Sequence, residues 1–198
     1  MTTYVYPSII PTESTVELLS NTATFVSPIT GATQTLDRGG ERWRISLVHR
    51  NLRTAQRGEL MGFLAKLNGQ QHRVTLYNHA ENNRGAFGGT PLVAGGSQTG
   101  NSLNIDGCSL TITNWIRAGD WFSVSDELKL CTADANSDGS GLATISFVPR
   151  IRTAPANDDP LTTTAGTGTF ILDSNSVSWS NKPGGFSDFS VSFVEDIT

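Results

Sequence analysis

The chain has 198 residues, a formal net charge of −4 and a hydrophobic content of 37%. This length suits one domain with a substantial core, and the acidic total argues against a nucleic-acid-binding protein, which normally carries a clustered basic surface. No apolar run approaches the roughly 18 residues that a transmembrane helix needs, and the first ten residues lack the charged and apolar regions of a signal peptide. We therefore expect a single domain over residues 1–198, made in a cytoplasm.

The first forty residues are polar, and prolines interrupt them. We expect an N-terminal arm over residues 1–20 and a short strand near 24–26. Residues 27–36 (SPITGATQTL) combine a proline-bearing turn with a following extended run. Gly39-Gly40, directly before the next apolar run, predicts a hairpin turn.

One stretch, residues 54–67 (TAQRGELMGFLAKL), has the periodicity of a helix. Its large apolar side chains recur at i, i+3, i+4 and i+7, which places Leu60, Phe63, Leu64 and Leu67 on one stripe. Thr54 is the expected N-cap, and Asn68-Gly69 supplies the left-handed residue that commonly ends a helix. Alternating runs on both sides, at 43–50 and 73–77, predict strands on which this helix packs.

Beyond residue 77 the sequence predicts a long loop and then many short strands. The loop covers residues 78–91, a length that is usually functional or partly disordered. The predicted strands lie at residues 92–94, 101–105, 109–113, 121–124, 128–131, 142–148, 170–172, 177–179 and 189–193. The run at 142–148 is expected to stop at Pro149. This spacing favours a mainly β chain, a sandwich or barrel with a single packed helix.

No motif predicts a catalytic, cofactor-binding or metal site. Residues 134–139 (DANSDG) match the first half of a calcium loop, but Ile145 occupies the twelfth position, where that loop needs a bidentate carboxylate. A polar turn is the better interpretation. Cys108 and Cys131 lack the spacing of a metal site, and buried free thiols are expected, with a disulfide left open. His49 is expected to pack beside Trp43 rather than act as a base.

Several aromatic side chains are of a kind that can stack on sugars. They are Trp115, Trp121, Trp179 and Tyr77. Aromatic residues in β proteins more often belong to the core, and the core is the expected location here.

Charge is unevenly distributed along the chain. Residues 38–84 contain nine basic and three acidic side chains, whereas the remainder contains five basic and fifteen acidic ones. Two interpretations are open. Either the charges decorate solvated faces, or copies of the chain attract one another through unlike surfaces, as head-to-tail contacts that can close into a ring. Contacts of the second kind should weaken as salt rises.

The order of four segments resembles the distal-tail or minor tail proteins of long-tailed bacteriophages. These segments are residues 27–43 (SPITGATQTLDRGGERW), residues 62–70 (GFLAKLNGQ), residues 90–107 (TPLVAGGSQTGNSLNIDG), and residues 117–155, which begin RAGDWFSVSDELKLC. Each segment taken alone shows only the pattern of a strand and a turn. The resemblance depends on the order of the segments, and it extends from about residue 25 onward.

The resemblance implies a non-enzymatic virion protein with the tail-tube/distal-tail fold. It implies a homohexameric ring in the tail that joins the tail tube protein to baseplate hub or tail-tip proteins. DNA passes through this ring without specific binding, and no membrane partner is expected. The major tail tube protein is the nearest alternative, and a carbohydrate-binding or adhesin module and a hydrolase without a visible motif are two others. A separate C-terminal sugar-binding domain has little room in 198 residues.

Overall fold

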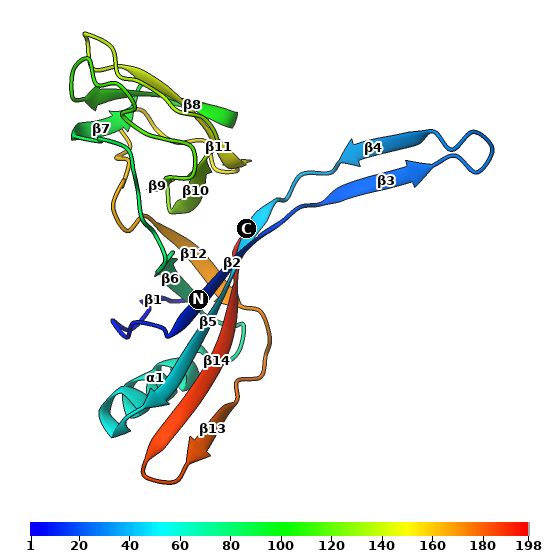
Figure 1. Cartoon of the computed structure of the whole chain (residues 1–198), viewed down its shortest axis with the longest axis vertical. Coiled ribbons are helices and arrows are strands. Elements are labelled where there is room, and N and C mark those ends of the chain that lie inside the picture. The colour runs from blue at the N-terminus through cyan, green and yellow to red at the C-terminus, as the bar shows by residue number, and fades with distance from the viewer. Residues whose placement is uncertain (198) are drawn as a thin grey trace.

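In the computed structural model, which describes residues 1–197, the strands form two large sheets and one separate hairpin. Figure 1 shows the two sheets following one another along the long axis, while the hairpin projects to one side. The expected mainly β chain with one helix is confirmed for the described residues. The strands form several sheets rather than one closed sandwich or barrel. Over residues 1–197, no helix has the length and apolar character needed to cross a membrane.

The larger sheet has seven strands and contains both ends of the chain. Its order is β1 (Thr3–Val5), β6 (Arg73–Tyr77), β12 (Thr167–Leu172), β14 (Phe186–Glu195), β5 (Arg42–Leu52) and β2 (Glu13–Leu19), with β13 (Trp179–Lys182) beside β14. All pairs are antiparallel except β1 with β6. Residues 1–20, expected as an N-terminal arm, contain the edge strands β1 and β2.

Helix α1 (Thr54–Leu67) has the predicted bounds and packs on the seven-stranded sheet. Leu60, Leu64 and Leu67 are buried in the same core cluster as Trp43, as their spacing predicts. The cap prediction holds only at the C-terminus, where Asn68 adopts the left-handed conformation. Arg53, not Thr54, takes the N-cap position, and its side chain makes no capping hydrogen bond.

The smaller sheet has five strands and its own core. Its order is β7 (Gly89–Val93), β8 (Gly100–Cys108), β11 (Ala143–Ile151), β10 (Glu127–Cys131) and β9 (Trp121–Val124). Phe122 and Phe147 are buried at its centre and meet edge to face at 5.5 Å. Strand β11 continues through Pro149 to Ile151, so the expected stop at Pro149 is wrong.

Two predicted strands differ from the structure because side-chain and turn geometry override the alternating pattern. Residues 109–113 form turns: Thr111 has a φ of +55°, and the Ile112 amide donates to the Ser137 hydroxyl. The strand expected at 177–179 starts only at Trp179.

The long loop after β6 contacts its own chain at several points. The side-chain amide of Asn83 donates to the carbonyl oxygens of Trp121 and Thr163 at 2.7 and 2.8 Å. Asp120 accepts hydrogen bonds from the amides of Arg84 and Gly85. The loop therefore joins the strands of both sheets, and its last residues enter β7.

The separate hairpin consists of β3 (Thr22–Val26) and β4 (Thr33–Asp37), and its tip is the proline-bearing turn expected from the sequence. It continues the β2–β5 pair outward, since Leu19 pairs with Arg42 and Thr22 pairs with Asp37. We call residues 20–38 the projecting arm. Gly39-Gly40 lie in the returning chain at the base of this arm and do not form the expected hairpin turn.

Candidate assembly surface

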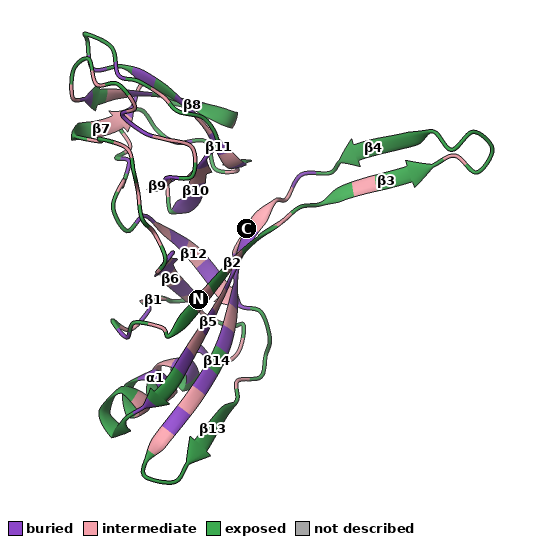
Figure 2. Ribbon diagram, viewed as in Figure 1, coloured by how far each residue is buried: buried purple, intermediate pink, exposed green. Residues whose placement is uncertain are grey.

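The projecting arm exposes large apolar side chains on a two-stranded hairpin. Phe25 is 63% exposed, Ile29 at the tip 92% and Leu36 62%, and Figure 2 shows the arm as mostly exposed along its length. Fully burying one such side chain is worth about 1.5–3 kcal/mol, and an isolated two-stranded hairpin is at best marginally stable in water. The arm therefore has the composition of a segment whose apolar side chains become buried against another surface.

The strand register places Phe25 and Leu36 on one face of the arm and the threonines, together with Val26, on the other face, which we call the polar face. Ala23 pairs with Leu36 and Phe25 with Gln34, while Thr24 pairs with Thr35 on the opposite face, because side chains alternate along a strand. A hollow of about 780 Å³ runs along the arm between Ala23 and Arg38. We call Ala23, Phe25 and Leu36 the apolar strip.

Most of the arm is also free of charge, since residues 20–36 contain no Asp, Glu, Lys or Arg. The two charged residues of the arm, Asp37 and Arg38, lie at its base. Contacts between identical chains of net charge −4 meet like-charge repulsion. An uncharged segment is suited to such contacts.

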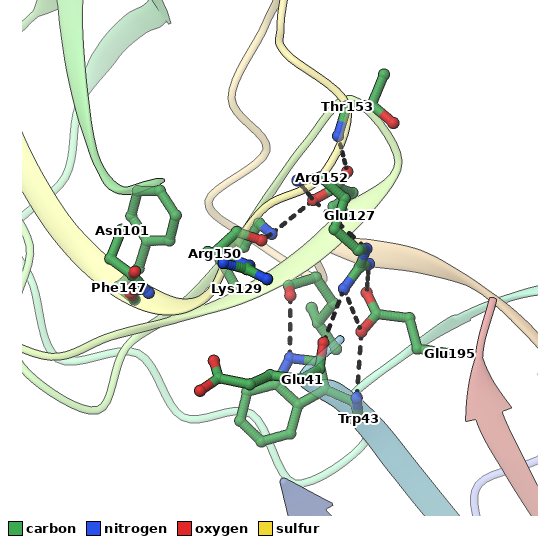
Figure 3. Close-up of polar contacts among 11 residues, drawn as sticks. Glu41, Trp43, Asn101, Glu127, Lys129, Phe147, Arg150, Arg152, Thr153 and Glu195 are labelled. Atoms are coloured by element: carbon green, nitrogen blue, oxygen red, sulfur yellow. Dashed lines mark hydrogen bonds and ion pairs between the residues drawn. The ribbon is translucent and has the colours of Figure 1, made fainter. Parts of the chain in front are cut away.

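The base of the arm lies against a cluster of buried charges between the two sheets. This junction cluster consists of Glu127, Lys129, Arg152 and Glu195 (Figure 3). Its Lys129 ammonium lies 2.6 Å from Glu127, and its Arg152 guanidinium 2.6 Å from Glu195. The side chain of Glu195 is 1% exposed and that of Lys129 0%, so each charge depends on its partner.

Hydrogen bonds complete the junction cluster. Glu127 accepts from the amides of Arg152 and Thr153 at 3.2 and 2.8 Å. Burial pushes the pKa of Glu127 upward, but Lys129, its hydrogen bond, and the Thr153 amide and Arg152 outweigh burial and lower that pKa overall. Burial also lowers the pKa of Lys129, against the opposing effect of Glu127. The cluster is thus a buried, hydrogen-bonded connection between β10, β11 and β14.

Ion pairs within the chain use part of the uneven charge seen in the sequence. Arg44 pairs with Glu17 and Asp173, and Arg50 pairs with Glu13. Arg73 pairs with Asp196. Three of the nine basic residues of the 38–84 segment therefore meet acidic residues of the remainder within the seven-stranded sheet. The interpretation that the partition creates two unlike surfaces for head-to-tail contact stays a prediction.

The acidic turn at residues 134–139 uses its oxygens within the protein. The side-chain oxygens of Asp134 and Asn136 accept from the amides of Ala118 and Asn114. Asp138 accepts from the amides of Ser140 and Leu142, both at 2.8 Å, and these bonds lower its pKa. All three side chains therefore accept hydrogen bonds from backbone amides.

The other singled-out residues lie in the two cores. His49 is fully buried on the Trp43 face of β5, as expected, with its Nε2 2.9 Å from the Tyr6 hydroxyl. Cys108 and Cys131 are buried free thiols, as predicted, and burial raises the pKa of Cys108 to about 11. Reactive thiols are normally accessible and have a lowered pKa, and neither buried cysteine has these properties.

The four aromatic candidates for sugar stacking are separated in the structure. Trp115 is buried, Trp121 packs against Trp43 at 4.7 Å, and Trp179 is half-exposed and stacks on Phe189. Tyr77 borders a cavity of about 400 Å³. That cavity also contains Phe87, three asparagines, Glu81 and His79.

No protein-family model matches the sequence, and no curated protein sequence matches it significantly. The assignment of function therefore depends on the geometry of the chain and on the order of its motifs. Sequence reasoning missed the arm as a surface, although an uncharged stretch of seventeen residues containing Phe25, Ile29 and Leu36 was a usable signal. The junction cluster gives no local signal, because its members lie up to 68 positions apart.

Proposed function

We propose that this protein is a structural subunit of a bacteriophage tail, and in particular a distal-tail ring subunit between the tail tube and the baseplate hub or tip. The observation that carries the proposal is the projecting arm, whose exposed Phe25, Ile29 and Leu36 need a covering surface that its own chain does not provide. The covering surface is a second copy of the chain, since the arm is uncharged and the copies share one net charge.

The dimensions of the arm support a contact between whole subunits. From Ser20 to Ile29 the chain spans about 30 Å at the usual rise of a strand, which is about the diameter of a small domain. Such an arm reaches across a neighbouring subunit. A protrusion received by a different part of the neighbour is a heterologous contact, which generates a closed ring or an open filament. A ring of six copies follows from the resemblance.

Two variants test the contact. Phe25→Ser with Leu36→Ser removes the apolar strip, and Thr24→Ser with Thr35→Ser changes the polar face of the same paired strands. In sedimentation velocity at increasing concentration, we expect the first pair to lose self-association and the second to keep it. Equal behaviour of the two variants would exclude the apolar strip as the contact.

The position in the particle is a separate question with a separate test. We expect a reconstruction of the virion to place one ring of this chain at the end of the tail tube. Many copies stacked along the tube would instead assign it as the tail tube protein, and a location away from the tail axis would refute both assignments.

A sugar-binding module is the second candidate, and the cavity beside Tyr77 and Phe87 favours it. Aromatic faces with asparagine and threonine side chains are suited to binding a small polyhydroxylated ligand. Binding of the purified chain to a glycan array, lost in Tyr77→Ala, would support that candidate. The absence of binding would leave the structural role alone.

A further inference from the structure

We propose that Arg150 and Arg152, at and just beyond the end of β11, fix the direction of the projecting arm, so that the five-stranded sheet determines where the arm meets a second copy. The role of the second copy rests on the proposed function. The fixed direction of the arm is a property of the single chain and can be measured without any partner.

Arg150 occupies the space beside Gly39 that a side chain at that position would fill. A Cβ atom placed on Gly39 would lie 1.3 Å from Nη2 of Arg150 and 2.5 Å from its Cζ. Gly39 has a φ of +68°, a conformation that residues with side chains rarely adopt. The bare backbone of Gly39 and the guanidinium of Arg150 are therefore fitted to one another at the base of the arm.

Arg152 holds the same segment two residues further along. Its guanidinium donates to the carbonyl oxygen of Glu41 at 3.3 Å and to Glu195 at 2.6 Å. Glu195 in turn accepts from the amide of Trp43 at 3.1 Å. These contacts are visible in Figure 3, where Glu41 and Trp43 lie beneath the junction cluster.

Trp43 adds a further point of attachment, because its indole N–H donates to the carbonyl oxygen of Leu128 in β10 at 3.0 Å. The returning chain is thus held at positions 39, 41 and 43 by residues of β10, β11 and β14 and the segment after β11. Only two residues connect β2 to β3 on the outgoing side, where the Arg38 amide donates to the carbonyl oxygen of Asn21. The five-stranded sheet therefore fixes the position of the arm through the returning chain.

The length of the arm amplifies any change at its base. A rotation of about 10° there displaces the tip by roughly 5 Å, given a span of about 30 Å at the rise of a strand. Heterologous contacts close into a ring only when each subunit turns by the required angle, and otherwise they form open chains. The direction of the arm therefore decides between a closed ring and irregular association.

The test measures the direction of the arm within one chain. Nitroxide labels on Ile29→Cys at the tip and Gln56→Cys on α1 report one distance by pulsed electron paramagnetic resonance, in samples diluted with unlabelled chain. Both native cysteines are buried, so the two new thiols label selectively. We expect a single narrow distance peak in the otherwise unchanged chain.

Three substitutions then alter the contacts at the base. Arg150→Ala removes an exposed side chain, so the chain is expected to fold. Gly39→Ala forces the guanidinium away from the same contact. Arg152→Lys keeps a positive charge beside Glu195 and withdraws the reach to Glu41. Arg38→Ala is the matched control, since it removes an exposed arginine on the arm itself.

We expect the narrow peak to be lost in Arg150→Ala, Gly39→Ala and Arg152→Lys and to be kept in Arg38→Ala. A narrow peak that survives in both arginine substitutions of the base, or a broad distribution in the unchanged chain, would overturn the inference. Sedimentation equilibrium of the same proteins separates the two proposals. A chain that stays monomeric up to about 1 mM while keeping its narrow peak refutes the ring and leaves the fixed arm standing.

Discussion

The hydroxyl oxygen of Tyr6 lies 2.9 Å from Nε2 of His49, inside the core between α1 and the seven-stranded sheet. Tyr6 also meets the ring of His79 at 6.0 Å. Burial lowers the pKa of His49, partly offset by the carbonyl of Ile10, and burial together with His49 lowers the pKa of His79. The surroundings of Tyr6 therefore oppose the protonation of both histidines.

The first prediction is a loss of stability in mild acid. The unfolded histidines bind protons below about pH 6.5 while the folded ones resist protonation, so their contribution to stability is present above that pH and is lost as pH falls through it. For one proton, the free energy of unfolding falls by at most about 1.4 kcal/mol per pH unit. Urea titrations between about pH 7.5 and pH 5.5 measure this slope.

His49→Gln should reduce that slope, and His72→Gln, outside the cluster, should leave it unchanged. Glu81 acts in the opposite sense, because burial raises its pKa and its contribution grows as pH falls. The difference between the two histidine variants isolates the effect of His49. Equal slopes in both variants and the unchanged chain would contradict the prediction.

The second prediction concerns the helix. Leu64 is 2% exposed and packs in the core of the larger sheet, so Leu64→Ala should lower the free energy of unfolding by about 2–5 kcal/mol. Glu59→Ala, on the exposed side of α1, should change it by no more than about 0.5 kcal/mol. Chemical denaturation measures both. A loss at Leu64 no larger than that at Glu59 would show that α1 is not part of the core.

The helix and most strands could be predicted because their signals are local. The i, i+3, i+4 and i+7 pattern of residues 60–67 reports one buried stripe, and alternation at 43–49 reports one buried sheet face. The pattern at 109–113 has the same alternation, but Ser137 supplies a side-chain partner for the Ile112 amide that no local pattern reveals. Hydrogen bonds to a distant part of the chain therefore determine that residues 109–113 form turns instead of a strand.

The candidate assembly surface was harder to predict, because exposure is not a property of sequence alone. Phe25 and Leu36 have the alternation of an ordinary half-buried strand, and only the structure shows them on an arm away from both cores. The pairing of charges is hidden from the sequence for a related reason. Arg44 and Glu17 are distant in sequence and 3.2 Å apart in the structure.

The third prediction is that calcium leaves the stability of the chain unchanged. Asp134, Asn136 and Asp138 already accept hydrogen bonds from backbone amides, and Ile145 stands where a calcium loop needs a bidentate carboxylate. The melting temperature should be the same with calcium and with a chelator. Asp138→Ala should lower it in both buffers, since the Ser140 and Leu142 amides lose their acceptor. A rise in melting temperature with calcium would refute the turn interpretation.

The last prediction reverses the salt dependence expected from the sequence. Salt weakens contacts made by exposed ion pairs, since the screening length falls from about 10 Å at 0.1 M to about 3 Å at 1 M. The projecting arm carries no charge over residues 20–36, and the chains that it joins repel one another through their net charge of −4. Raising sodium chloride should therefore leave self-association unchanged or slightly stronger.

Sulfate should strengthen it further, because that ion favours the burial of apolar surface. Sedimentation equilibrium at about 0.1 M and about 1 M sodium chloride, with Phe25→Ser and Leu36→Ser as the control that lacks the apolar strip, measures the effect. An affinity that falls tenfold or more at high salt, a loss of about 1.4 kcal/mol, would show that ion pairs make the contact. The unlike-surface interpretation of the charge pattern would then replace the arm.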